Sequence, residues 1–362
     1  MINIYQSDSH QIYRISCELQ QAQQTPIRDF DKYLLNKETK KQRLRDIKIY
    51  ITMYESYTAE EKSIISNQIK PIDSIDLHND WNELIKIRNN DLKCSSRCKT
   101  GLKVVDYFTF QERLHTKGKY NVNYFEFISN IEHFKRKMFI QNMLIYYEKN
   151  TKQKNIFVLY KNVYNICISA INAFRPIIAM ELYALFKPTC MVDFCCGWGG
   201  RLVGASAMNL KKYIGIDINT NLRGPYHKLT NFLRHNSTTN IKLYLKNALE
   251  IDYSEMVYDM VFTSPPYYFI EKYSNNDKYE NKKSKMREEF YIPLFEKTFR
   301  YLQPGGNFCL NVNHAIYEEI CLPMFGEPNH KIPLKKSQRQ NDYSEFIYVW
   351  KKIDGRLTME AK

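Results

Sequence analysis

Two short turns in the sequence combine residues that could bind a ligand and act on it. The first runs from Asp193 to Arg201, reads DFCCGWGGR and follows an apolar run that predicts a buried strand. Glycines at a strand-to-helix turn allow a sharp bend and a close approach of the backbone to a ligand. The second turn runs from Ser264 to Tyr267, reads SPPY and follows another apolar run. An acidic residue, Asp217, closes a further predicted strand between the two turns.

The glycine turn and Asp217 together indicate the kind of ligand. The segment from Gly197 to Leu202 (GWGGRL) lacks the third glycine of the dinucleotide fingerprint, which weakens the case for a nicotinamide cofactor. An acid about 20 positions beyond a glycine turn can bind ribose hydroxyls. Asp193, at the end of the preceding strand, can face a cationic ligand group; a capping or turn role is the alternative. A cation joined to a nucleoside describes S-adenosylmethionine.

The SPPY turn suits an aromatic amine as substrate. Pro265 and Pro266 fix the backbone and remove two donors, so their carbonyls and Ser264 can accept hydrogen bonds from an exocyclic amine. Two acceptors on its hydrogens would push the nitrogen toward tetrahedral geometry and free its lone pair to attack a sulfonium methyl in line. Tyr267 or Tyr268 can stack on the base. This reaction needs neither a covalent enzyme intermediate nor a metal; a structural loop at a strand end is the alternative.

Residues 174 to 351 resemble the S-adenosylmethionine-dependent amino-methyltransferases that modify adenine N6 or cytosine N4 in DNA, and are most similar to the solitary enzymes of phages and large DNA viruses. The resemblance implies a Rossmann-like, seven-stranded methyltransferase sheet and a target base flipped out of the duplex. It also implies a catalytic role for Ser264, Pro265, Pro266 and Tyr267. The cofactor-binding residues that it implies are Phe174, Arg175, Pro176, Asp193, Cys195, Gly197, Gly199, Asp217 and Asn247.

The identity of the target base and of the substrate stays open at this point. Ser264 is commoner among cytosine-N4 enzymes, whereas the resemblance to viral enzymes favours adenine N6 slightly. Methylation of RNA or of a protein glutamine is an alternative, because related folds use similar Pro-Pro-Tyr loops. A catalytically inactive subunit that binds nucleic acid is a further alternative, against which the intact motifs argue.

Strands that alternate with helices from residue 126 predict an α/β fold with a largely parallel sheet. We expect a methyltransferase domain over residues 126–355. Residues 1–125 carry no strong motif and are expected to form a mainly helical accessory region, with nucleic-acid binding as its candidate role. We expect no large target-recognition domain after the SPPY turn.

The composition favours a nucleic-acid partner inside the cell. The net charge of +14 attracts polyanions, and double-stranded DNA is the partner we expect. Lys37 to Lys48 and Asn329 to Arg339 are basic segments that could contact phosphates. The sequence has no long apolar run or signal peptide, and its nine cysteines indicate reduced thiols. Cys94 and Cys98 lack the further ligands that a zinc site needs, so no metal is expected.

Overall fold

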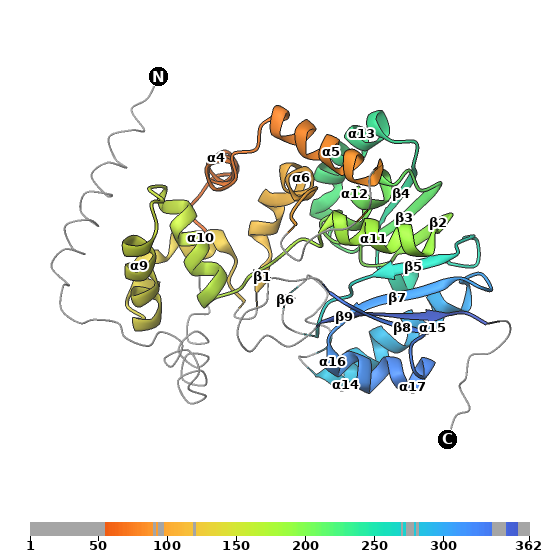
Figure 1. Ribbon diagram of the computed structural model, residues 1–362. Helices are drawn as coiled ribbons and strands as arrows, with labels where there is room; N and C mark the ends of the chain where they lie inside the picture. The colour runs from red at the N-terminus through yellow and green to blue at the C-terminus, as the bar shows by residue number, and fades with distance from the viewer. Residues whose placement is uncertain are drawn as a thin grey trace.

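The computed structural model describes residues 55–89, 92, 98–118, 121–268, 271–272, 279, 282–334 and 345–353. The described part begins with helices and continues into a β-sheet with helices on both faces (Figure 1). The helices before the sheet are α4 (Ala59–Ile69), α5 (Ser74–Asn89), α6 (Leu102–His115), α7 (Tyr124–Ser129), α8 (Ile131–Lys135), α9 (Met138–Asn150), α10 (Ile156–Cys167) and α11 (Pro176–Phe186).

The sheet has seven strands in the order β4-β3-β2-β5-β7-β9-β8. The strands are β2 (Cys190–Asp193), β3 (Lys212–Asp217), β4 (Asn240–Leu245), β5 (Met260–Thr263), β7 (Asn307–Val312), β8 (His330–Pro333) and β9 (Phe346–Lys351). Strand β9 runs antiparallel to both of its neighbours, and the other neighbouring pairs are parallel. The predicted seven-stranded, Rossmann-like methyltransferase sheet is confirmed.

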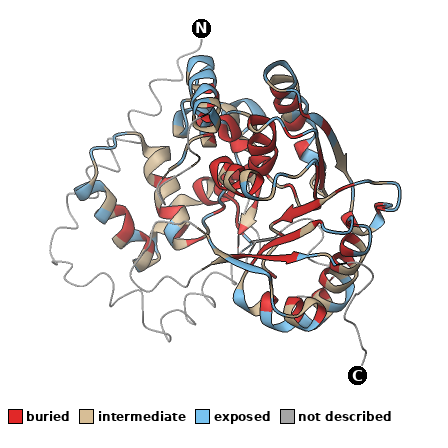
Figure 2. Cartoon of the chain, turned by 45° about the vertical axis from the view of Figure 1, so that its right-hand side comes forward, coloured by how far each residue is buried: buried red, intermediate tan, exposed pale blue. Residues whose placement is uncertain are grey.

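Helices cover both faces of the sheet because side chains alternate along its central strands. In β2, Met191 packs with helices α5, α6, α11, α12 (Gly200–Ala207) and α13 (Arg223–Asn236) on one face. The next residue, Val192, packs on the other face, which α15 (Ile292–Arg300), α16 (His314–Ile316) and α17 (Leu322–Phe325) cover. Buried residues line both layers in Figure 2. The carboxyl ends of β2, β3 and β5 thus meet at one edge, as parallel pairing requires.

A third hydrophobic cluster holds the helical part together and crosses the domain boundary expected after residue 125. It joins residues of α4 and α6 to residues of α7, α8, α9 and α10, up to Ile168. Phe125 and Phe127, on either side of the expected boundary, are both fully buried in this cluster. Helices α7 to α10 therefore pack on the preceding helices and not on the sheet. Conversely, Trp81 and Val104 belong to the core of the sheet.

A small second sheet ties the helical part to the segment that follows the SPPY turn. Strand β1 (Lys117–Gly118) pairs antiparallel with β6 (Glu271–Lys272). Gly118 is needed there, because a Cβ at this position would lie 2.0 Å from the Cβ of Ser169. The chain directly after α6 is thereby hydrogen-bonded to the chain a few residues beyond Tyr267.

Several predicted features fall outside the described residues. They are Cys94, the basic segment Lys37 to Lys48, and the part of Asn329 to Arg339 that follows Leu334. The first part of the Asn329 to Arg339 segment contains the edge strand β8, which the sequence pattern did not predict.

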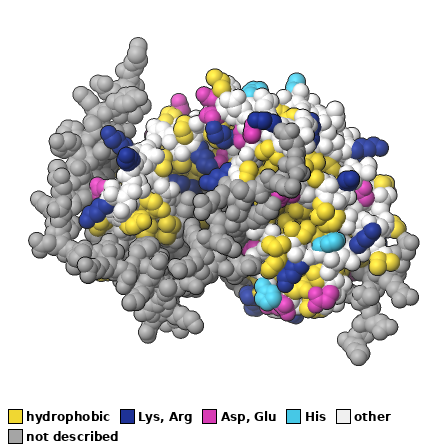
Figure 3. Space-filling view, in the orientation of Figure 1, with side chains coloured by type: hydrophobic (Ala, Val, Ile, Leu, Met, Phe, Trp, Pro, Cys, Tyr) yellow, Lys and Arg dark blue, Asp and Glu magenta, His cyan; other side chains and the backbone are white. Residues whose placement is uncertain are grey.

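Within the described ranges, no helix is long and apolar enough to cross a membrane. Lys and Arg side chains gather over the region of α4 and α10 in Figure 3.

Candidate active site

The loop after β2 is a tight turn that requires glycine at three positions. Gly197 and Gly199 have φ angles of +56° and +83°, in the left-handed region that other residues rarely adopt. Gly200 begins α12, and a Cβ there would lie 1.9 Å from the carbonyl oxygen of Phe174. The backbone at Phe174 therefore closes directly on the glycine loop.

Asp193, at the end of β2, is fully buried and clamps this loop. Its carboxylate accepts hydrogen bonds from Arg201 Nε at 2.7 Å and from the Tyr213 hydroxyl at 2.8 Å. Arg201 also donates to the Cys195 carbonyl at 2.6 Å, and its guanidinium lies 5.1 Å from the centre of the Phe174 ring. The cation that Asp193 faces is thus Arg201 of this chain, where we expected a ligand group. Asp193 positions the loop through Arg201.

Asp217, at the end of β3, holds the loop from its other side. The two carboxylate oxygens accept from the backbone N–H of Gly197 at 2.7 Å and of Asn219 at 2.9 Å. Burial raises the pKa of Asp217 to about 6, although both N–H groups favour the charged form. An ionised carboxylate offers about four lone-pair sites, so two remain for further donors such as ribose hydroxyls.

Ser264 and Tyr267 meet a side chain of the neighbouring strand β7. Asn311, which is 2% exposed, accepts at Oδ1 from the Tyr267 hydroxyl at 3.0 Å and from Ser264 Oγ at 3.3 Å. The Asn311 amide nitrogen donates to the Phe346 carbonyl at 3.1 Å, which fixes the orientation of the amide. Because the Ser264 hydroxyl donates to Asn311, its lone pairs remain available to accept from a substrate.

The backbone after the two prolines is held by Tyr291. The Tyr291 hydroxyl donates to the Pro266 carbonyl and accepts from the backbone N–H of Tyr268 at 2.9 Å. Tyr268 has a φ of +51°, is buried, and donates its hydroxyl to Glu319. In the described part of the chain, no residue donates to the Pro265 carbonyl. Tyr268 and the Pro266 carbonyl are therefore engaged in the fold, which leaves Tyr267 and the Pro265 carbonyl as the candidates for contacting a base.

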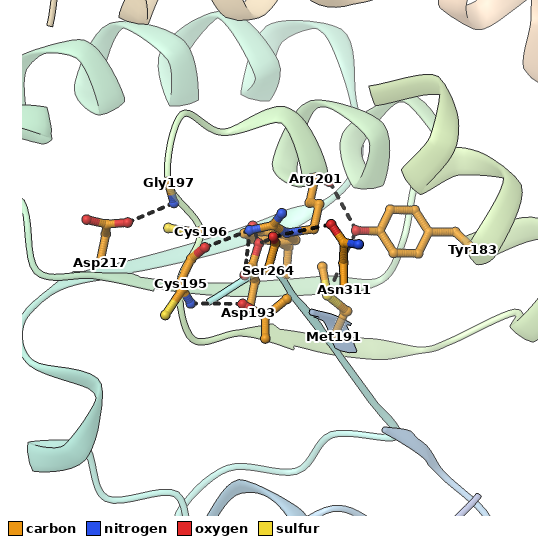
Figure 4. Close-up of polar contacts among 12 residues, drawn as sticks. Tyr183, Met191, Asp193, Cys195, Cys196, Gly197, Arg201, Asp217, Ser264 and Asn311 are labelled. Atoms are coloured by element: carbon orange, nitrogen blue, oxygen red, sulfur yellow. Dashed lines mark hydrogen bonds and ion pairs between the residues drawn. The ribbon is translucent and has the colours of Figure 1, made fainter. Parts of the chain in front are cut away.

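The glycine loop and the SPPY turn are joined directly. The backbone N–H of Cys195 donates to Oγ1 of Thr263, the residue before Ser264, at 3.1 Å. Figure 4 shows Asp217 on one side of the loop and Ser264 with Asn311 on the other. A ligand whose ribose is bound at Asp217 could therefore extend along the loop toward Ser264. Burial raises the pKa of the Cys195 thiol well above its ordinary value, which favours the neutral thiol.

The remaining sequence candidates have contacts that are structural. Arg175 donates to the Cys98 carbonyl at 2.9 Å, which joins the N-terminal part to the sheet domain, and Pro176 starts α11. Asn247 caps a short turn after β4, where its side chain accepts from the backbone N–H of Leu249. Since β4 pairs with β3 and places Leu245 opposite Asp217, Asn247 lies at the same sheet edge as the ribose candidate.

The donor set of this edge fits S-adenosylmethionine. Asp217 keeps acceptor sites for ribose hydroxyls. The backbone around Gly197 carries no Cβ that would prevent a close approach. Asn247 lies one strand further along, on the side of Asp217 away from Ser264. The residues that would hold the cofactor thus lie on β2, β3 and β4, and the residues that would face its methyl end lie on β5 and β7.

Three residues that the sequence reading did not single out complete the site. Asn311 orients Ser264 and Tyr267, Tyr291 fixes the proline carbonyl, and Arg201 neutralises Asp193. Asn311 had a detectable signal, since it is an amide that interrupts the apolar run from Phe308 to Val312. Tyr291 had none, because it is one of 28 tyrosines and its role depends on tertiary packing.

Residues 188–310 match the family model of the RNA cap guanine-N2 methyltransferases. The matched segment includes the glycine loop, Asp217 and the SPPY turn. This match and the strand order confirm the predicted methyltransferase fold with its cofactor, S-adenosylmethionine. No protein among those with curated descriptions matches significantly.

Solved structures with a similar fold include methyltransferases whose sequence identity to this chain is low. An rRNA methylase from Streptococcus thermophilus is 15% identical with a TM-score of 0.34, and the alignment covers 51% of this chain and 99% of that one. TrmN from Thermus thermophilus is 16% identical with a TM-score of 0.34, and 49% of each chain is covered. A methyltransferase from Pyrococcus furiosus is 19% identical with a TM-score of 0.34, covering 49% of this chain and 83% of that one.

Proposed function

We propose that this chain transfers a methyl group from S-adenosylmethionine to the exocyclic amine of a flipped base in double-stranded DNA, with adenine N6 slightly favoured over cytosine N4. The observation that supports the proposal is the pair of acceptors at the SPPY turn. The Ser264 hydroxyl is oriented by Asn311, and the Pro265 carbonyl receives no hydrogen bond from a described residue. Both belong to the turn that is hydrogen-bonded to the glycine loop through Thr263.

The residues of the turn have separable roles in this reaction. The cofactor supplies an electrophilic methyl group on a sulfonium. Ser264 and the Pro265 carbonyl accept hydrogen bonds from the two N–H groups of the target amine, which localises the nitrogen lone pair for attack on the methyl carbon. The methylated nitrogen then loses one proton to water. Tyr267 stacks on the flipped base, and its hydroxyl bond to Asn311 fixes the ring before the base arrives.

A basic groove next to the cofactor edge supports a polyanionic substrate. The groove has a volume of about 390 Å³ and lies between α13 and β4. Arg223, Arg234 and Lys246 line it, and the described residues of its lining include no Asp or Glu. Tyr226 forms part of its wall and donates to the Gly197 carbonyl of the glycine loop. Phosphates bound in this groove would lie close to the cofactor-binding edge.

RNA is the second candidate substrate, and the family match favours it. The matching model describes methylation of guanine N2, which is also an exocyclic amine and would use the same acceptor pair. Two further alternatives are methylation of a protein glutamine amide and binding of nucleic acid without catalysis. Under either alternative, the assay described next would find no methylated base.

Mass spectrometry of nucleosides tests the proposal. Duplex DNA and RNA are each incubated with the full chain and S-adenosylmethionine, digested, and analysed for N6-methyladenine, N4-methylcytosine and N2-methylguanine. The proposal expects a methylated base in DNA. N2-methylguanine in RNA with unmodified DNA would overturn the DNA assignment, and absence of any methylated base would overturn the activity.

A variant of Tyr267 tests the role of the SPPY turn. Tyr267→Ala removes the stacking ring, so methyl transfer should fall by about 5- to 150-fold, because stacking is worth roughly 1–3 kcal/mol per base. Cofactor affinity measured by calorimetry should stay unchanged. Tyr267→Phe is the matched control, since it keeps the ring and removes the hydroxyl with its hydrogen bonds to Asn311 and Ser264. Equal activity of Tyr267→Ala and wild type would separate the turn from base binding.

A further inference from the structure

A second pocket, outside the candidate active site, lies in the helical part of the molecule. It has a volume of about 210 Å³ and is bounded by the end of α4, by α6, by α10 and by the segment that leads to α11. Its apolar wall includes Phe110, Val158 and Ile171. The polar residues that line it are Lys70, Arg113, Lys161, Asn162, Asn165 and Asn172. The pocket therefore combines three cations and three amides on an apolar base.

The positive charge of this pocket is only partly balanced. Among the described residues, Asp106, buried in α6, is the carboxylate that forms ion pairs with these cations, and it pairs with both Lys70 and Arg113. Lys161 forms no ion pair with any residue in the described ranges. Its ammonium donates to Oδ1 of Asn165 at 2.8 Å, a neutral acceptor. Among the described residues, three cationic side chains thus face one paired carboxylate, so the pocket carries an excess of positive charge that is largest when Lys161 is protonated.

Burying the charged ammonium of Lys161 costs free energy, because no described anion is paired with it. Its ammonium lies 4.7 Å from the centre of the Tyr164 ring and 5.5 Å from that of Tyr124, so aromatic faces replace much of its water. Burial, followed by repulsion from Arg113 and Lys70, lowers the pKa of Lys161 to about 7. The pKa of Lys70 falls to about 8, with burial again the largest cause and Arg113 the next. An uncompensated cluster of this kind is stabilised by any anion that enters it.

We propose that the pocket formed by Lys70, Arg113, Lys161 and the neighbouring amides binds a phosphate monoester. A phosphate group has only acceptor oxygens and carries nearly two negative charges at neutral pH, which matches the excess of positive charge. Lys161 supplies an ammonium with further N–H donors, and Asn165 keeps its amide nitrogen as a donor because its oxygen is used by Lys161. The volume accommodates a phosphate group and only part of an attached sugar, so the rest of the ligand would remain outside.

Two sources of such a phosphate have the same chemistry, and a titration can distinguish them. One is the 5′-terminal phosphate of a nucleic-acid strand, and the other is a free nucleoside monophosphate. The proposal does not depend on the methyl-transfer reaction, since none of its residues belongs to the glycine loop or the SPPY turn. Its failure would leave the proposed function unaffected.

The direct test observes Lys161 in the wild-type full chain. Lysine labelled with ¹³C at Cε is followed by NMR during a pH titration, and the Lys161 signal is assigned with Lys161→Arg. Inorganic phosphate, compared with chloride at equal ionic strength, should raise the pKa of Lys161 above its value near 7, because an adjacent anion favours the charged ammonium. An unchanged Lys161 pKa at saturating phosphate would overturn the proposal.

Binding measurements on variants identify the source. Lys161→Met keeps the aliphatic stem and should weaken phosphate binding about tenfold or more, while Lys154→Met, at an exposed position before α10, should not. A 5′-phosphorylated oligonucleotide that binds more tightly than its 5′-hydroxyl form, with a difference that Lys161→Met removes, supports a strand terminus. A nucleoside monophosphate that competes with inorganic phosphate, without that difference, supports the free ligand. Equal binding of every anion to wild type and Lys161→Met would contradict both.

Discussion

Replacement of Asn311 by alanine is the most informative perturbation of the candidate active site, because one side chain there orients two catalytic candidates. Asn311 Oδ1 accepts from the hydroxyls of Ser264 and Tyr267, and the amide nitrogen is fixed by the Phe346 carbonyl. Asn311→Ala removes the side-chain acceptor of both hydroxyls. Tyr267 keeps its hydrogen bond to the backbone carbonyl of residue 311 at 3.2 Å, whereas Ser264 keeps only its longer contact of 3.4 Å with the Tyr267 hydroxyl. The Ser264 hydroxyl can then point its hydrogen at the target amine, where an acceptor is required.

The size of the effect follows from the bonds that are lost. A neutral hydrogen bond contributes roughly 0.5–1.5 kcal/mol net, so losing the two that orient Ser264 and Tyr267 should cost about 1–3 kcal/mol of transition-state stabilisation. This corresponds to a fall of about 5- to 150-fold in the rate of methyl transfer. Asn311→Ala also removes the hydrogen bond that the Phe346 carbonyl accepts from the Asn311 amide. This loss should lower the free energy of unfolding by about 1–3 kcal/mol.

The assay separates orientation from binding. Transfer of a radiolabelled methyl group to nucleic acid gives the rate, calorimetry gives the affinity for S-adenosylmethionine, and thermal unfolding confirms that the variant is folded. Asn307→Ala is the matched control, since Asn307 lies at the opposite end of the same strand. We expect a lower rate and unchanged cofactor affinity for Asn311→Ala alone. A folded Asn311→Ala protein with the wild-type rate would refute the role assigned to the Ser264 hydroxyl.

Three further outcomes are expected. Asp217→Ala should weaken binding of S-adenosylmethionine at least tenfold, since charge-assisted hydrogen bonds contribute roughly 1.5–3 kcal/mol each. The affinity of the wild type should fall as the pH drops below about 6, where Asp217 gains a proton and loses acceptor sites, and calorimetry on both sides of that pH checks this. Gly200→Ala should lower the melting temperature through its clash with the Phe174 carbonyl, whereas Gly224→Ala, whose Cβ would meet nothing within 4 Å, should not. The unfolded chain holds the Lys161 proton up to pH 10.5 and the folded chain only up to about 7, so stability measured by denaturant should rise across that window in wild type, and less so in Lys161→Met.

The sequence was sufficient to predict the sheet and the relative placement of its turns. Apolar runs ending in Asp193, Asp217 and Thr263 each form a strand, and parallel pairing brings their carboxyl ends to one edge. The periodicity that identifies a strand is local, and so is the requirement for glycine at Gly197. Both can therefore be read without knowledge of the rest of the chain.

The partners of these residues could not be predicted in the same way. Arg201 is only eight positions after Asp193, yet nothing in the spacing says that its guanidinium turns back to fill the place expected for a ligand cation. Asn311 reaches Ser264 from 47 positions away, through strand pairing that depends on the complete sheet. Phe127 packs with the preceding helices and not with the sheet, and its helical pattern could not distinguish between the two.

The pairing of β1 with β6 limits how this protein can be modified by recombination. Lys117 and Gly118 are hydrogen-bonded to the segment just beyond Tyr267, while Thr109 of α6 donates to the carbonyl of Trp198 in the glycine loop. A breakpoint placed between the helical part and the sheet would cut a unit that contacts both motifs. Grafting a foreign N-terminal region to change target preference should therefore alter turnover as well, unless α6 and β1 are kept with the recipient.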